Sequence, residues 1–92
     1  MTTHRAFHEI IFTILTLCSR QSARRTFIMY HANLSWYMLG VYLDYMQEHE
    51  LIAKTLDDES MKEVITITDK GFQFIKLFKQ IHKVLGISEI EA

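Results

Sequence analysis

The side chains best suited to chemistry in this sequence are cations, and the chemistry they suit is phosphate binding. Arg20, Arg24 and Arg25 lie in one short polar segment, and a guanidinium presents a planar fork of N–H donors that matches phosphate oxygens. Lys54 and Lys62 stand on either side of an acidic turn, and we expect them to flank each other at the base of a hairpin. These five cations predict contacts to a nucleic-acid backbone.

Other chemistries are not favoured. His4 and His8 are one helical turn apart, but two ligands do not make a metal site, and His31, His49 and Cys18 fall on separate predicted elements. There is no glycine-rich phosphate loop, no nucleophile with a base and an orienting group, and no paired-carboxylate pocket. The sequence therefore predicts no metal, no cofactor and no enzymatic activity.

Length and composition predict a single intracellular domain. Ninety-two residues allow one core, and 49% apolar residues are enough to fill it. The single cysteine cannot form an internal disulfide, and no apolar run is long enough for a membrane span. We therefore expect a cytoplasmic, nucleoid-associated protein with no membrane contact. The formal net charge is -1, so DNA binding must come from a local patch.

Periodicity and caps predict a small α+β fold that is mainly α. Ser35 and Thr68 are good N-caps, and Asn33 suits the left-handed residue that ends a helix. We expect helices over residues 4–19, 26–32, 35–49 and 69–85, and strands over residues 51–55 and 61–67. A short helix, a tight turn, a longer helix and a hairpin form a winged helix-turn-helix of three helices and a two-stranded wing, followed by a C-terminal helix.

The third predicted helix is the expected DNA reader. It turns Leu39, Tyr42, Leu43 and Met46 inward, and no Lys or Arg lies between Asn33 and Ala53. Its N-terminal tip is therefore the part expected to meet DNA, through Asn33, Ser35, Trp36 and Tyr37. The alternative is that Trp36 packs in a core or an interface and Tyr37 is an ordinary exposed aromatic residue.

The last predicted helix carries a coiled-coil seam. Its apolar residues are spaced three and four apart, at Gly71, Phe74, Phe78, Ile81 and Leu85. We expect a dimer interface made of Phe74, Leu77, Phe78, Ile81 and Leu85, with Phe12 added from the polar side of the first helix. The alternative is a helix buried wholly within its own domain.

Residues 26–35, TFIMYHANLS, carry a resemblance to a known family. This string resembles a segment of the archaeal winged-helix proteins related to the small Sulfolobus chromatin-associated DNA-binding proteins. Matching pieces follow at Tyr42, Leu43, Met46, Leu51 and Ile52, and at residues 67–71. The resemblance implies a homodimer joined by the C-terminal helix in an antiparallel coiled coil, with the third helix presented to the major groove. This chain lacks those proteins' basic surplus and has a shorter last helix, which favours a regulator with a narrow target.

We therefore expect residues 4–67 to form the winged helix-turn-helix and residues 68–87 a dimerisation helix within the same compact unit. The leading hypothesis is a dimeric protein that binds double-stranded DNA and regulates transcription. The alternative is a protein–protein interaction module that binds no DNA. The acidic turn at residues 57–59 would repel phosphates, so it is a candidate surface for a basic protein partner.

Overall fold

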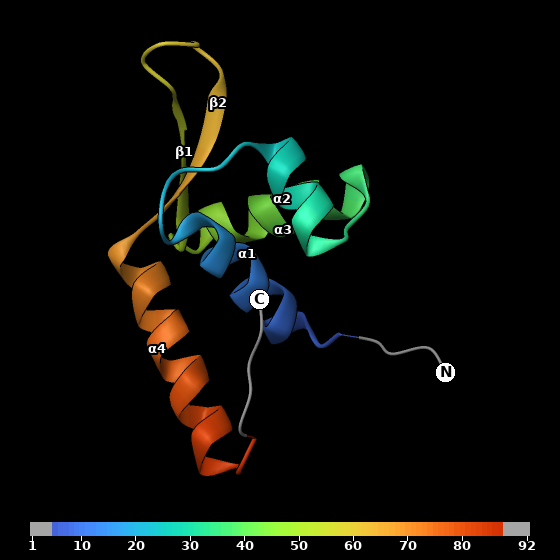
Figure 1. Cartoon of the computed structure of the whole chain (residues 1–92), viewed down its shortest axis with the longest axis vertical. Helices are drawn as coiled ribbons and strands as arrows, with labels where there is room; N and C mark the ends of the chain where they lie inside the picture. Colours follow the sequence, from blue (N-terminus) through green and yellow to red (C-terminus); the bar gives the residue numbers. More distant parts are fainter. Residues whose placement is uncertain (1–4, 88–92) are drawn as a thin grey trace.

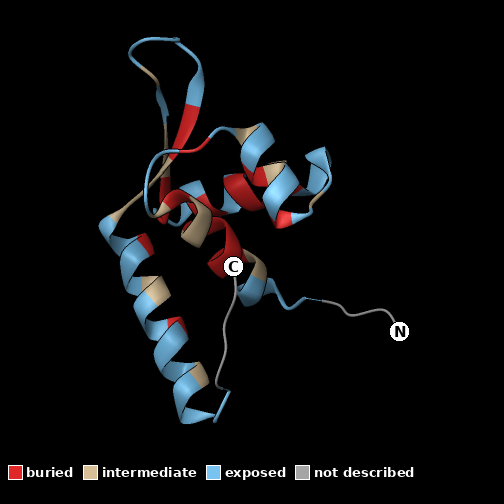
Figure 2. Ribbon diagram, in the orientation of Figure 1, coloured by how far each residue is buried: buried red, intermediate tan, exposed pale blue. Residues whose placement is uncertain are grey.

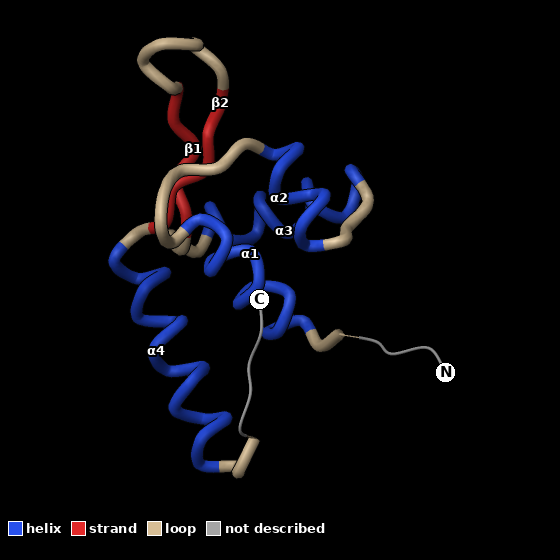
Figure 3. The backbone as a smooth tube through the Cα atoms, in the orientation of Figure 1, coloured by secondary structure: helices blue, strands red, loops and turns tan. Residues whose placement is uncertain are grey.

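The computed structural model describes residues 5–87 and has the predicted order of elements. The elements are α1 (Phe7–Cys18), α2 (Arg25–Ala32), α3 (Trp36–Glu48), β1 (Ile52–Leu56), β2 (Glu63–Ile67) and α4 (Asp69–Val84). In Figure 1 the first three helices form a compact group, the hairpin extends from it at the top, and α4 descends along its side. Figure 3 shows the hairpin as the strand region of an otherwise helical chain. The predicted winged fold with an added C-terminal helix is confirmed.

Local side-chain chemistry sets the ends of the helices. The Ser35 hydroxyl accepts a hydrogen bond from the Met38 N–H at 3.1 Å, and the Thr68 hydroxyl accepts one from the Gly71 N–H at the same distance. Each satisfies a first-turn donor that has no partner within its helix. Asn33 ends α2 in the left-handed conformation, with φ 56° and ψ 51°. The three predicted capping roles are confirmed.

The boundaries differ most from the prediction at two places, and elsewhere by a single residue. The first helix was expected over residues 4–19, whereas α1 begins at Phe7, and His4 lies outside the described residues. The second strand was expected to start at Met61, but Met61 has a φ of 58° and belongs to the turn. A left-handed residue cannot continue an extended strand, so β2 begins at Glu63.

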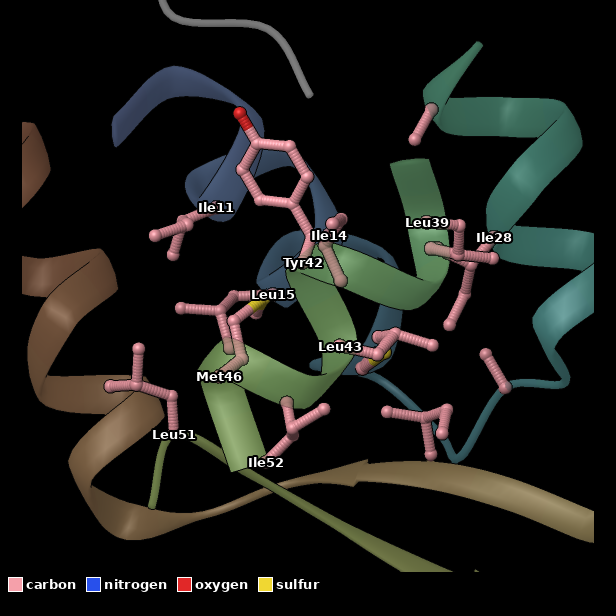
Figure 4. Close-up of a cluster of buried hydrophobic side chains, with 14 residues drawn as sticks. Ile11, Ile14, Leu15, Ile28, Leu39, Tyr42, Leu43, Met46, Leu51 and Ile52 are labelled. Atoms are coloured by element: carbon pink, nitrogen blue, oxygen red, sulfur yellow. The ribbon is translucent and has the colours of Figure 1, made fainter. Parts of the chain in front are cut away.

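The core lies between α1, α2, α3 and the base of the hairpin. Figure 4 shows its side chains converging from these elements, and Figure 2 shows that burial is concentrated there while most of α4 is exposed. The predicted inward face of α3 is confirmed, since all four residues are buried: Leu39, Tyr42, Leu43 and Met46. Fully burying one such aliphatic side chain contributes about 1.5–3 kcal/mol. No helix within residues 5–87 has the length and apolar character needed to cross a membrane.

The hairpin is antiparallel and gains a third partner from an earlier loop. Its register runs from Ile52 opposite Ile67 to Leu56 opposite Glu63. Ala23, in the connection between α1 and α2, exchanges two backbone hydrogen bonds with Ile65 of β2, at 2.9 and 2.7 Å. The arginine-bearing connection is therefore attached to the wing, whereas its sequence indicated only a connecting segment.

The side of α4 that faces α1 corrects one expectation. Phe12 was expected on the polar side of the first helix, but it is only 2% exposed and stacks on Phe78 at a centroid distance of 4.4 Å. The expectation of a polar side was wrong because α1 packs against α4 as well as against α2 and β2. Phe78 is itself 8% exposed, so it packs mainly within its own chain.

Gly71 also belongs to the interior of the domain and not to an outward seam. A Cβ atom at Gly71 would lie 2.4 Å from the Leu51 carbonyl oxygen and 2.6 Å from Cγ1 of Ile67. The first turn of α4 therefore passes directly against the chain that enters the hairpin. The expected seam of five residues is therefore wrong at the N-terminal end of α4, because the lack of a side chain at Gly71 lets this helix approach its own domain closely.

Candidate nucleic-acid interface

The α2–turn–α3 unit presents an exposed α3 face that begins at the helix tip. Trp36 is 56% exposed and Tyr37 is 76% exposed, and Val41 continues the same outward side. The inward half of α3 is the part seen in Figure 4. The alternative in which Trp36 fills the core is wrong, since more than half of its surface is open to solvent.

The tip of α3 lies next to a cation. The Arg25 guanidinium carbon is 6.0 Å from the centroid of the Trp36 ring, within the range of a cation–π contact. The first N–H groups of α3 carry the positive end of the helix dipole. The structure therefore combines an arginine, an aromatic ring and a helix N-terminus at one place on the surface.

Arg5 is a second cation near this unit, and sequence reasoning missed it. One of its terminal nitrogens donates to the Asn33 carbonyl oxygen at 3.3 Å, which places the side chain against the turn between α2 and α3. Arg5 and Asn33 are far apart in the sequence, so no local pattern indicates the contact. Asn33 itself serves the turn through its backbone conformation, and its side chain is exposed.

The other arginines lie beside the wing. Arg24 donates to the Ser60 hydroxyl at 3.1 Å, and Arg25 forms an ion pair with Glu63 at 2.6 Å. Arg20 stands on the connection before α2 and is exposed. Arg24 and Arg25 thus both contact the wing, and Arg25 already has a carboxylate partner.

The two wing lysines are not neighbours, and this expectation was wrong. Lys54 is paired in register with Ile65, whereas Lys62 lies beyond the last pair of the ladder, in the turn. Lys54 forms an ion pair with Asp44 of α3 at 2.9 Å. This hydrogen bond and the lysine's charge hold the pKa of the Asp44 carboxyl below its usual range. The lysine therefore neutralises an acidic group on the outward side of α3.

The acidic tip of the wing is ordered by its own hydrogen bonds. The Asp57 carboxylate accepts from the Ser60 N–H and from the Ser60 hydroxyl, both at 2.9 Å, and these bonds lower the pKa of Asp57. The ionised carboxylate is thus favoured at the end of the wing. It would repel phosphates at close range, which disfavours insertion of the tip into a groove. Within residues 5–87, no three His, Cys, Asp or Glu side chains gather to hold a metal ion.

The outer side of α4 carries an apolar strip. Leu77, Ile81, Val84 and Leu85 are exposed and line a shallow groove of about 220 Å³ together with Gln80. Of the residues predicted for a dimer interface, three belong to this strip, while Phe74 and Phe78 turn toward α1. Val84 completes the strip and was not among the predicted interface residues.

Comparisons with known proteins agree with this architecture. A family model described as winged helix-turn-helix matches residues 4–86. An uncharacterized protein of Methanocaldococcus jannaschii is 32% identical over 76 residues, which cover 83% of this chain and 33% of that protein. A second uncharacterized protein of the same organism is 30% identical over 83 residues, covering 90% of this chain and 76% of that protein. The chain therefore spans about a third of the first relative and three quarters of the second.

Two solved structures share the fold. Sso10a-2, a DNA-binding protein from Sulfolobus solfataricus, superposes with a TM-score of 0.76 at 22% identity, over 89% of this chain and 83% of that one. The transcriptional regulator BldR from the same organism gives a TM-score of 0.71 at 17% identity, over 87% of this chain and 62% of that one. The resemblance inferred from residues 26–35 is confirmed.

Proposed function

Because this chain belongs to the winged helix-turn-helix family, we propose that it is a dimeric DNA-binding protein that regulates transcription. It contacts duplex DNA through the tip of α3 and the arginine-bearing connection between α1 and α2. The observation that carries the proposal is the contact of Arg25 with Trp36, which sets a guanidinium beside the first residue of α3. A phosphate at this place would meet both the arginine and the positive end of the helix.

The existing ion pair does not prevent this contact. The Arg25 and Glu63 side chains are both partly exposed, and exposed ion pairs of this kind are worth only about 0–1 kcal/mol. A phosphate can therefore replace Glu63 at small cost. Arg24 precedes Arg25 in the chain, and Arg20 lines the same pocket as Arg24, so both can add phosphate contacts from this connection. Lys54 remains engaged with Asp44.

The charge of the α3 side supports a narrow target. Asp44, Glu48 and Glu50 lie on or just after α3 and are exposed. Non-specific binding depends on counterion release by cations that neutralise phosphates, and this surface has few of them. We therefore propose a regulator that depends on a particular sequence or shape and not a protein that coats DNA.

The apolar strip of α4 supports dimerisation. Leu77, Ile81 and Leu85 share it with Val84, and a contiguous apolar patch on a small domain marks an interaction surface. We propose that two copies of α4 bury these strips against each other. Phe78 and Phe12 lie behind the strip and support α4 from inside the protomer.

Fluorescence anisotropy with a labelled random duplex tests the DNA step. Affinity should fall steeply with salt. The logarithm of the binding constant, plotted against the logarithm of the salt concentration, should have a slope of about -0.9 for each phosphate contact. The double variant Arg20→Gln, Arg24→Gln should reduce that slope by about 2. The control Lys79→Gln, Lys83→Gln removes the same charge from exposed positions on α4 and should leave the slope unchanged. Absence of binding at low salt, together with no enrichment in a selection from random duplexes, would exclude the proposal.

Sedimentation velocity tests the dimer. Ile81→Asp places a charge in the exposed strip and should give a monomer, whereas Lys79→Asp, on the opposite side of α4, should remain a dimer. Phe78→Asp is unsuitable because Phe78 is buried within its own protomer, so its loss would unfold the chain. A wild-type protein that sediments as a monomer at micromolar concentration would refute the dimer.

A protein–protein interaction module is the second candidate, and the exposed side chains of α3 favour it. Tyr37, Met38 and Val41 are exposed, and aromatic and methionine side chains are enriched in protein interfaces. The acidic wing tip would then face a basic partner. The duplex titration separates the two candidates, since this one predicts no binding to random or selected DNA under any salt condition.

A further inference from the structure

A pocket of about 740 Å³ opens between the end of α1 and the start of α2. Its walls include Leu17 and Ala23, the two arginines Arg20 and Arg24, and the ring of Phe27. This volume is in the range of small-molecule sites, which combine apolar walls with a few polar groups. Figure 1 shows the two bordering elements joined by the connection that crosses the base of the wing, where Ala23 pairs with Ile65 of β2.

The charge of the pocket is positive in a chain whose net charge is -1. Two arginines and no acidic side chain are among its lining residues. Within residues 5–87, Arg20 makes no side-chain hydrogen bond or ion pair, and Arg24 uses one donor for Ser60. The pocket therefore has unused guanidinium donors, which fit an anion such as a phosphate.

The floor of the pocket is fixed in place. Ala23 is buried and is bound to Ile65 of β2 through both its N–H and its carbonyl. The arginines on either side of it are therefore held on a rigid segment. A preformed site of this kind loses little entropy when a ligand binds.

An aromatic row continues from the pocket along α2. Phe27 is 46% exposed, and its ring centroid lies 4.2 Å from that of His31. Tyr30 is 80% exposed, and its ring centroid lies 5.4 Å from that of His31. In duplex DNA the base faces are covered by neighbouring base pairs, so a duplex gives these rings nothing to stack on. They suit a ligand with a free aromatic face.

We propose that this pocket binds unpaired nucleotides, with the phosphate between Arg20 and Arg24 and the base against Phe27. The ligand is either a single-stranded stretch of nucleic acid or a free mononucleotide, since both present a phosphate and an open base. The inference deepens the proposed DNA-binding function and rests on it in treating the arginines as phosphate ligands. It differs in assigning a role to Phe27, which the duplex contacts do not use.

Fluorescence anisotropy measures binding of the protein to a labelled oligothymidine strand and to a labelled random duplex. Calorimetry measures its binding to deoxyadenosine monophosphate. The variant is Phe27→Leu, which keeps an apolar side chain but removes the aromatic face. The matched control is Phe72→Leu on α4, because Phe72 has nearly the same exposure, 47%. Thermal melts confirm that both variants are folded.

Phe27→Leu should weaken strand binding by about fivefold or more, because stacking is worth about 1–3 kcal/mol per base. Phe72→Leu should leave strand binding unchanged, and neither variant should alter duplex binding. If the mononucleotide binds and Phe27→Leu abolishes that binding, the ligand is a free nucleotide. If the strand binds and the mononucleotide does not, the ligand is single-stranded nucleic acid. The proposal is overturned if neither the strand nor the mononucleotide binds, or if the Phe27→Leu and Phe72→Leu variants behave alike.

The outcomes separate this inference from the proposed function. Duplex binding without binding of either the strand or the mononucleotide overturns only the inference. Strand binding that depends on Phe27, without duplex binding, overturns only the proposed function. If the duplex, the strand and the mononucleotide all fail to bind, the proposed function and this inference are both overturned.

Discussion

Adding one methyl group at Gly71 should destabilise the fold, whereas the same addition at Gly40 should stabilise it. Both glycines lie within helices, α4 and α3 respectively. A Cβ at Gly71 would lie 2.4 Å from the Leu51 carbonyl oxygen, and a Cβ at Gly40 would meet no atom within 4 Å. The pair therefore separates the helix propensity of alanine from the cost of a close contact.

The magnitude follows from the contacts of α4. Alanine is favoured over glycine in a helix interior by about 1 kcal/mol, which is the whole expected effect of Gly40→Ala. At Gly71, carbon atoms need roughly 3.5 Å from their neighbours, so the start of α4 must move by roughly 1 Å. That shift costs about 1–3 kcal/mol in overpacking. It also strains the hydrogen bond from the Thr68 hydroxyl to the Glu50 carbonyl, 2.6 Å long, which is worth about 1 kcal/mol.

Thermal unfolding followed by circular dichroism measures both effects. Gly71→Ala should lower the free energy of unfolding by about 1–3 kcal/mol, once the gain in helix propensity is subtracted. In a domain of this size, that loss lowers Tm by roughly 4 °C or more. Gly40→Ala should raise Tm by a few degrees. An unchanged or higher Tm for Gly71→Ala would refute the close approach of α4 to the hairpin base.

Two titratable groups give further predictions. Burial raises the pKa of the Cys18 thiol to about 12, so the folded protein at pH 8 should react very slowly with a thiol reagent and rapidly once unfolded; fast reaction of the native protein would contradict the burial. The Ser60 hydrogen bonds lower the pKa of Asp57, so this carboxylate stabilises the fold above its ordinary pKa, and that stability is lost as pH falls through the lowered value. Carbon-detected NMR titration of Ser60→Ala should show the Asp57 pKa rising toward its usual range, and an unchanged value would exclude the hydrogen bond as the cause.

Features that depend on neighbouring residues were predictable from the sequence. Ser35 and Thr68 cap helices through an N–H group three residues further along, and Asn33 needs only its own backbone conformation. The buried side of α3 follows from helical spacing alone. These signals are local, so one sequence contains them in full.

Features that depend on which elements meet were not predictable. Arg25 pairs with Glu63, and Arg5 donates a hydrogen bond to the Asn33 carbonyl oxygen. Both partners lie far away in the chain, so the sequence did not indicate these contacts. Phe12 was misplaced because a single helical stripe assumes that one side of a helix is covered. Thr13, the next residue, is also buried, and its hydroxyl is satisfied by donating to the Glu9 carbonyl. A polar residue that satisfies itself in this way hides a buried flank from pattern analysis.

The two hydrogen bonds between Ala23 and Ile65 also constrain how the chain can fold. The whole helix-turn-helix lies in the segment between these residues, and Ile65 belongs to the second strand, which follows it. The buried backbone of Ala23 can be paired only after the later strand is in place, and closing so long a segment is a slow, non-local step. During synthesis, the arginine-bearing connection therefore reaches its final position only once the wing has emerged. In the finished protein, melting of the second strand would release this connection at the same time, so the two should unfold as one cooperative unit.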